Sequence, residues 1–136
     1  MMQQTLMLIK PDTVKNNHVG QIIARIEDSH FRIQALKMVQ MNQETAKRFY
    51  AVHDGKPFFD KLIQFMTSGN IVAMILEKEN AIEDLRTLIG KTNPTDAACG
   101  TIRFDYGINK TRNAVHASDS PENAKTEISI IFPELG

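Results

Sequence analysis

His116 is the residue of this sequence best suited to chemistry, because it lies between a short apolar stretch and a run of small polar residues (NAVHASDS, 113–120). An imidazole titrates near neutral pH, so it serves as a nucleophile, a base or a ligand without extreme tuning. The alternative is a histidine in a turn before a helix, with Ser118 or Asp119 as the N-cap and Pro121 in the first turn. The two interpretations are compatible, and the local residues alone do not decide between them.

Cationic side chains that suit a phosphate occur at widely separated positions. Lys10 ends the first expected strand, Arg86 follows Leu85 close to the apolar face of a helix, and Arg103 lies in an irregular region. The planar guanidinium group donates two parallel hydrogen bonds, which match phosphate oxygens. Taken singly, each cation favours a solvated surface charge, and only the place of Arg86 beside the apolar face of its helix argues against this.

Two aromatic residues lie in expected helices in the middle of the chain, Tyr50 near the end of one and Phe58 at the start of the next. Periodicity alone places Phe58 in the core. An aromatic ring also stacks on a nucleobase, and such stacking tolerates any base because every base has a π-face. Lys56 adds positive charge beside Phe58.

Other familiar sites are not indicated. His18, His30 and His53 show no HxH or HExxH spacing, and the single cysteine, Cys99, is far from them, which argues against zinc. The sequence has neither GxxxxGK[ST] nor GxGxxG, so any nucleotide is held without a P-loop or a Rossmann turn.

Composition indicates one domain, residues 1–136, of an ordinary globular type. The formal net charge is zero, which gives no general case for binding nucleic acid or an anionic membrane surface. One cysteine excludes an intrachain disulfide, and no stretch predicts a secretory signal or a membrane span. We therefore expect a soluble, cytoplasmic protein.

The hydrophobic pattern predicts four strands and four helices. Strands are expected at residues 5–9, 31–41, 71–76 and 127–132. Helices are expected at residues 19–29, 42–52, 57–69 and 80–90. The order is that of a split β-α-β, ferredoxin-like α+β fold, in which helices cover a four-stranded antiparallel sheet.

The segment from Gly90 to Arg112 carries Gly, Pro, Asn and Thr without a sustained period. A long irregular segment inside a compact domain is usually functional. We therefore expect it to form a long loop at the active site.

Five stretches of the chain together resemble the nucleoside diphosphate kinase family over essentially the whole length. They are TLMLIKPD (5–12), PFF (57–59), TNP (92–94), GTIR (100–103) and NAVHASDS (113–120). The last is similar to the family signature NxxH[GA]SD[SA], which is highly specific. Order and spacing agree throughout.

The resemblance implies a ferredoxin-like core and a defined reaction. The γ-phosphate of a nucleoside triphosphate, typically ATP, passes to a nucleoside diphosphate, which maintains nucleoside and deoxynucleoside triphosphate pools. The route is ping-pong, through a phosphohistidine. Mg²⁺ is the implied cofactor and is carried by the substrate phosphates rather than by protein ligands.

The resemblance also assigns catalytic roles to four residues. His116 matches the nucleophile. Tyr50 and Glu127 match residues that position or polarise the histidine, and Ser118 supports Glu127. A carboxylate near an imidazole fixes its tautomer and ring orientation, which makes these roles physically sensible.

Six further residues match nucleotide contacts in the family. Lys10 and Asn113 match ligands of the sugar hydroxyls and nearby phosphate oxygens, and Phe58 matches the aromatic residue that stacks on the base. The matched phosphate ligands are Arg86, Thr92 and Arg103. The implied partners are nucleoside di- and triphosphates, with no specific nucleic acid and no membrane.

Three positions depart from the family pattern: Phe104 stands where Gly or Ala is usual, Cys99 where Pro is frequent, and Lys56 where Arg is usual. They bear on loop conformation and assembly rather than on a matched catalytic position. The chain also ends soon after Glu134, without the longer tail of many eukaryotic members. A homo-oligomer is expected, and a tetramer, a hexamer and a dimer stay open.

Two other functions remain as alternatives. A binding or regulatory module would keep the nucleotide site without useful turnover. A protein phosphorelay domain would use His116 to pass phosphate to a protein side chain.

Overall fold

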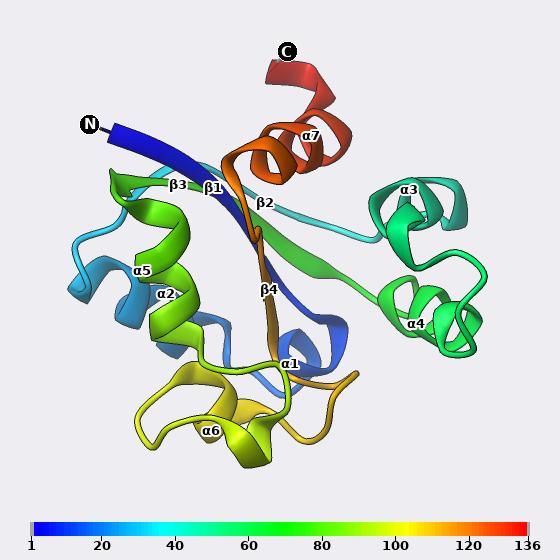
Figure 1. The fold of residues 1–136 in the computed structure, drawn as a ribbon, viewed down its shortest axis with the longest axis horizontal. Helices are drawn as coiled ribbons and strands as arrows, with labels where there is room; N and C mark the ends of the chain where they lie inside the picture. The colour runs from blue at the N-terminus through cyan, green and yellow to red at the C-terminus, as the bar shows by residue number, and fades with distance from the viewer. Residues whose placement is uncertain (1, 136) are drawn as a thin grey trace.

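A four-stranded antiparallel sheet with the order β2-β3-β1-β4 runs through the middle of the molecule (Figure 1). The computed structural model describes residues 2–135. The strands are β1 (Met2–Ile9), β2 (Arg32–Val39), β3 (Ile71–Glu79) and β4 (Val115–Ala117). This is the ferredoxin-like arrangement expected from the order of elements, and it is confirmed.

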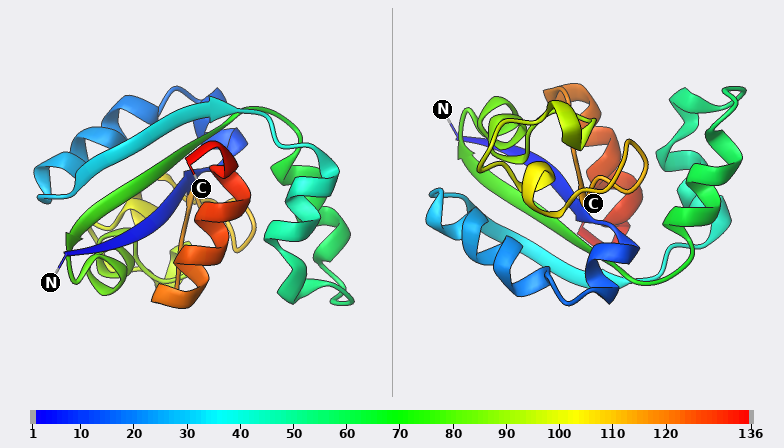
Figure 2. Two further views of the ribbon diagram at one scale, coloured as in Figure 1. Left: turned by 90° about the horizontal axis from the view of Figure 1, so that it is seen from above. Right: turned by 90° about the horizontal axis from the view of Figure 1, so that it is seen from below.

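Seven α-helices lie among residues 2–135. They are α1 (Pro11–Lys15), α2 (Val19–Asp28), α3 (Gln43–Phe49), α4 (Phe59–Met66), α5 (Ala81–Ile89), α6 (Ile102–Tyr106) and α7 (Pro121–Ile131). Three short 3₁₀ turns complete the chain: η1 (Ala51–His53), η2 (Pro94–Asp96) and η3 (Pro133–Leu135). Helices α2 and α5 pack on one face of the sheet, while α7 and the α3–α4 pair lie on the other (Figure 2).

The continuous apolar run of β1 is explained by these two layers of helices. Leu6 and Leu8 belong to the core under α3, α4 and α7, whereas Met7 and Ile9 belong to the core under α2 and α5. Successive side chains of a strand point to opposite faces, so a strand covered on both faces is apolar throughout. The strand predicted at 5–9 is therefore confirmed, and it extends back to Met2.

The strand predicted at residues 127–132 is wrong, because residues 127–131 belong to helix α7 and Phe132 is its C-cap. Ile128, Ile130 and Phe132 alternate, but Ala124 and Ile131 are the buried residues of the helix and have helical spacing. The fourth strand is instead β4, which pairs with β1 in a register that places His116 opposite Leu8. Three residues are too few to show a periodic pattern in the sequence.

The N-cap of α7 is Ser120, not Ser118 or Asp119 as expected. The Ser120 hydroxyl oxygen accepts a hydrogen bond from the backbone N–H of Asn123 at 3.0 Å, and Pro121 occupies the first turn. Ser118 is thereby free of a capping role, and its side chain has other partners.

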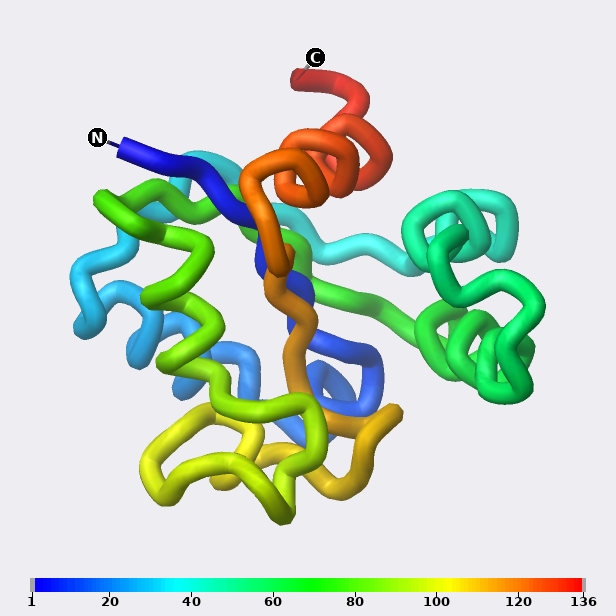
Figure 3. The backbone as a smooth tube through the Cα atoms, in the orientation of Figure 1, coloured from blue at the N-terminus to red at the C-terminus, as the bar shows by residue number. Residues whose placement is uncertain are grey.

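Residues 90–112 leave the end of α5, fold across one end of the sheet and lead into β4 (Figure 3). The segment is long, as predicted, but it is not wholly irregular, because it contains η2 and α6. On α2, Arg25 donates to the carboxylate of Asp105 at 2.8 Å and to the carbonyl of Gly100, which ties the segment to the helix layer.

Gly90, where this segment begins, cannot accept a side chain. Its φ is +89°, and a Cβ atom would lie 2.6 Å from Oγ1 and 2.9 Å from Cβ of Thr101. We therefore expect Gly90→Ala to lower the free energy of unfolding by about 2 kcal/mol or more. Chemical denaturation measures this change.

Gly20, in the exposed part of α2, is the matched control. A Cβ atom there meets nothing within 4 Å, so Gly20→Ala should stabilise the protein by about 0.5–1 kcal/mol. Equal effects of the two substitutions would contradict the assignment of strain to Gly90.

Candidate active site

His116 is carried by β4, and Glu127 reaches it from α7. The Nε2 atom of His116 lies 2.8 Å from Oε1 of Glu127, and both side chains are largely buried. An ionised carboxylate only accepts hydrogen bonds, so the ring proton resides on Nε2 and the lone pair on Nδ1. Helix α7 therefore selects which imidazole nitrogen is available to react.

Ser118 holds this carboxylate in place. Its hydroxyl donates to Oε1 of Glu127 at 2.7 Å, and the residue is fully buried beside β1, where its backbone N–H donates to the carbonyl of Leu6. The same carboxylate oxygen thus meets both Ser118 and His116. A carboxylate with two such partners has little freedom to rotate away from the imidazole.

The ring of Tyr50 stands nearly perpendicular to that of His116, with the centroids 6.2 Å apart. Its hydroxyl is buried and has no hydrogen-bond partner among the described residues, so the structure gives no direct hydrogen bond to His116. Burial raises the pKa of Tyr50, and the nearby charge of Glu127 raises it further. The phenol therefore remains a protonated donor with nothing yet to donate to.

Lys10 and Asn113, far apart in sequence, form a buried pair. The Lys10 ammonium donates to Oδ1 of Asn113 at 2.7 Å and to the carbonyl of Thr111 at 3.2 Å. The Asn113 amide group donates to the carbonyls of Thr92 and Lys110 at 2.9 and 3.1 Å. The end of β1 is thereby joined to the loop that precedes β4.

Burial, followed by the charge of Arg103, lowers the pKa of Lys10 to about 7, against the opposing effect of Asp12. In the unfolded chain this pKa is about 10.4. Between these values the unfolded state binds a proton that the folded state lacks, so the free energy of unfolding rises with pH. We expect a rise of about 2 kcal/mol from pH 7 to 9 from this residue.

Denaturation of Lys10→Met across this pH range tests the expectation, because the variant should lack that part of the rise. Lys15→Met, at an exposed position on α1, should keep it. An unchanged pH dependence in Lys10→Met would show that Lys10 is not the group responsible.

Two guanidinium groups contact β4 on either side of His116. Arg103 donates to the carbonyls of Val115 at 2.9 Å and Gly90 at 3.0 Å, and Arg86 reaches the carbonyl of Ala117 at 3.5 Å. Burial and the charge of Arg86 lower the pKa of Arg103 to about 10, which leaves it charged at neutral pH. The Nε–H of Arg103 is buried without a partner among residues 2–135.

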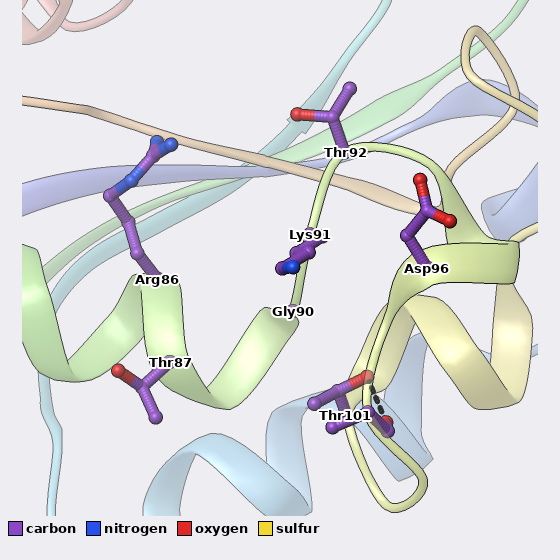
Figure 4. Close-up of a pocket in the computed structure, with 8 residues that line it drawn as sticks. Arg86, Thr87, Gly90, Lys91, Thr92, Asp96 and Thr101 are labelled. Carbon is purple, nitrogen blue, oxygen red and sulfur yellow. Dashed lines mark hydrogen bonds between the residues drawn. The ribbon is translucent and has the colours of Figure 1, made fainter.

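A hollow of about 430 Å³ lies between the end of α5 and the loop that follows it. Its lining includes Arg86, Thr92 and Asp96, and the side chains of Arg86 and Thr92 extend in the same direction, toward the strands (Figure 4). Two of the three expected phosphate ligands thus share one opening, and the third, Arg103, does not line it.

Phe58 presents an exposed aromatic ring and is not the core residue that periodicity alone indicates. It precedes α4 with 44% of its surface exposed, whereas the neighbouring Phe59 is buried. The Lys56 ammonium lies 6.0 Å from the centroid of the Phe58 ring, and the ring centroids of His53 and Phe58 are 5.3 Å apart. A flat, exposed ring with a cation beside it suits stacking with a nucleobase.

Two residues near the site were not singled out from the sequence. Phe49 lies 4.9 Å from the ring of His116, and nothing in its pattern distinguishes it from other apolar residues. His53 is joined to the site through Tyr50, and burial, Lys56 and His116 lower its pKa. The signal in the sequence that could have indicated His53 is its position three residues after Tyr50, which was already a candidate site residue.

Among residues 2–135, no group of three or more His, Cys, Asp or Glu side chains is arranged to hold a metal ion. The cationic side chains at the end of β1 and beside β4 are hydrogen-bond donors, namely Lys10, Arg86 and Arg103. Such a set binds anionic oxygens directly, and it fits a divalent cation only when that cation arrives on phosphate groups.

The family model of nucleoside diphosphate kinase matches residues 3–135. The chain belongs to the nucleoside diphosphate kinase family. A nucleoside diphosphate kinase of Histophilus somni (strain 2336) is 52% identical over 133 residues, which are 98% of this chain and 94% of that protein. That of Staphylothermus marinus is 53% identical over 132 residues, or 97% and 94% of the two chains.

Solved structures of nucleoside diphosphate kinases superpose closely on the chain. The enzyme of Aquifex aeolicus matches with a TM-score of 0.96 at 43% identity, covering 99% of this chain and 98% of that one. The apo enzyme of Encephalitozoon cuniculi has a TM-score of 0.93 at 37% identity, with 96% and 88% covered. The family, the fold and the phosphotransferase function expected from the sequence are therefore confirmed.

No helix among residues 2–135 has the length and apolar character needed to cross a membrane.

Proposed function

We propose that this nucleoside diphosphate kinase works by a ping-pong mechanism in which Nδ1 of His116 carries the phosphoryl group. The observation that carries the proposal is the 2.8 Å contact between Nε2 and Glu127, because it leaves the other ring nitrogen with a free lone pair. Ser118 supports this arrangement through its own hydrogen bond to the carboxylate.

In the first half-reaction, the Nδ1 lone pair attacks the γ-phosphorus of a nucleoside triphosphate. The new bond is N–P, and the bond between the γ-phosphorus and the β–γ bridging oxygen breaks, so a nucleoside diphosphate leaves. The Nε2 proton stays between His116 and Glu127, which stabilises the developing positive charge on the ring. In the second half-reaction, a terminal oxygen of another diphosphate attacks the same phosphorus and the N–P bond breaks.

Arg86 and Arg103 stabilise the phosphoryl group during both transfers. Negative charge is spread over the equatorial oxygens in the transition state, so fixed cations on both sides of the nucleophile act where charge develops. Thr92 adds a hydroxyl at the opening that it shares with Arg86. Mg²⁺ carried on the substrate phosphates would neutralise part of the remaining charge.

Lys10, Asn113 and Phe58 hold the nucleoside. The ammonium and amide groups bind the sugar hydroxyls and adjacent phosphate oxygens, and the exposed ring of Phe58 stacks on the base. Stacking without hydrogen bonds to the base edge gives broad tolerance of the base. Tyr50, with its unpaired phenol, packs against His116 and completes the wall behind the nucleophile.

Incubation with γ-labelled ATP and Mg²⁺ tests the mechanism. The protein should take up acid-labile, base-stable label, and any nucleoside diphosphate should then discharge it as labelled triphosphate. Nucleotide binding without label would instead indicate a binding module. Label that passes to a protein side chain but not to a free diphosphate would indicate a phosphorelay domain.

We also propose that the chain forms a homo-oligomer in the cytoplasm. β2 is an edge strand in the single chain, and Leu36 and Met38 on it are about half exposed. An unpaired strand edge with exposed apolar side chains is suited to pairing with a second copy. Cys99 is a free, exposed thiol, which suits a reducing compartment.

Light scattering in solution measures the assembly. A tetramer or a hexamer is expected, a dimer would require only the β2 edge, and a monomer would contradict the proposal. Cell fractionation tests the compartment separately.

A further inference from the structure

We infer that Phe49 is a positioning residue for His116, whose ring holds the plane of the imidazole so that Nδ1 is presented to the phosphoryl group. The inference rests on the proposed role of His116 as the phosphoryl carrier. Phe49 is not among the residues that the family resemblance matched, and it has no polar atom with which to contact a substrate.

The contact between the two rings is close and directional. Their centroids are 4.9 Å apart and their planes are inclined by 70°, which is an edge-on aromatic arrangement. Of the two benzene-type rings that meet His116 edge-on, Phe49 is nearer than Tyr50, at 4.9 Å against 6.2 Å. Phe49 therefore forms the immediate aromatic wall of the imidazole.

The hydrogen bond to Glu127 leaves the imidazole of His116 free to tilt, and contact with the ring of Phe49 restrains this tilt. The imidazole is fixed at its Cβ end by β4 and at Nε2 by the carboxylate. A single hydrogen bond at one ring atom tolerates tilting of the ring plane, and tilting moves Nδ1 away from the line of attack. A rigid surface against the ring suppresses that motion.

Phe49 is itself held firmly. It is the last residue of α3, is only 8% exposed, and packs edge-on against Tyr50 at 4.9 Å and 74°. A buried aromatic side chain between a helix end and a second ring has few alternative rotamers. The packing of α3 therefore fixes the position of the Phe49 ring, and the Phe49 ring in turn restrains the imidazole of His116.

The test compares Phe49→Leu with Phe59→Leu, since Phe59 is equally buried at 8% in the same core. Among residues 2–135, the phenyl and phenol rings edge-on to His116 are those of Phe49 and Tyr50, not that of Phe59. Phe49→Tyr keeps the ring and serves as the conservative variant. Phe49→Met replaces the leucine variant if that variant does not fold. The measurements are the rate of phosphoenzyme formation, the KM for the nucleotide, and the side-chain ¹H–¹⁵N spectrum of His116 in the resting enzyme.

We expect Phe49→Leu to slow phosphoenzyme formation about tenfold with little change in KM, and to broaden or shift the His116 nitrogen signals. Phe59→Leu should leave both the rate and the spectrum unchanged, and Phe49→Tyr should retain most of the rate. Equal behaviour of the two leucine variants, or a tyrosine variant as slow as Phe49→Leu, would overturn the inference.

A failure of the proposed function can be distinguished from a failure of the inference about Phe49. A wild-type protein that takes no label on His116 refutes the phosphohistidine route. The resting-state spectrum still reports whether Phe49 orders the imidazole, because it requires no turnover.

Discussion

Replacing His116 by alanine is expected to abolish phosphotransfer, with a loss on the order of 10⁵-fold or more in kcat. The reason is that the phosphoryl group loses the acceptor that we propose for it, and removal of a covalent nucleophile has effects of this size. Alanine also leaves Glu127 and Ser118 facing each other without the imidazole. The measurement is label incorporation from γ-labelled ATP, followed by the coupled assay of diphosphate phosphorylation.

His30→Asn provides the control for the loss of a histidine. His30 is exposed, lies away from the site at the end of α2, and has a φ of +73°, which asparagine tolerates better than alanine. It should keep full activity and full label. Label that persists in His116→Ala would show that another residue is the nucleophile.

The second large effect is expected for Arg103→Ala, which should lower kcat about 10³-fold and also destabilise the fold. The catalytic loss is expected because the substitution removes a fixed cation that we propose to stabilise the transferring group. The stability loss, about 2 kcal/mol, follows because the carbonyls of Gly90 and Val115 lose their donor. Initial rates at saturating nucleotide and chemical denaturation measure the two effects separately.

Arg103→Lys should not restore the activity, since an ammonium group cannot reproduce the planar fork that meets both carbonyls. Arg48→Ala, at an exposed position on α3, should change neither property. A kcat of Arg103→Ala within tenfold of the wild-type value would show that the guanidinium group does not act in the transition state.

Local pattern was sufficient where an element is defined by its own residues. The apolar run before Lys10 predicted β1, the helical spacing of Ile22 and Ile26 predicted α2, and the run from Ile71 predicted β3. Helix α2 buries one face of helical period, and β1 and β3 are buried on both faces as continuous apolar runs, so the local hydrophobic pattern reports each element directly. The alternation of Ile128 and Ile130 led to the wrong prediction of a strand, because a pattern with period two happens to occur within helix α7.

The sequence by itself determined the family, through motifs whose residue types and spacing are highly specific, and it supplied the candidate residues of the site. Only the tertiary structure decided how they meet. Glu127 reaches His116 because α7 packs against β1, and Arg86 and Arg103 reach β4 from α5 and α6. Phe49 joins them from α3. These contacts depend on where separate elements cross in the packed fold, which local periodicity does not encode.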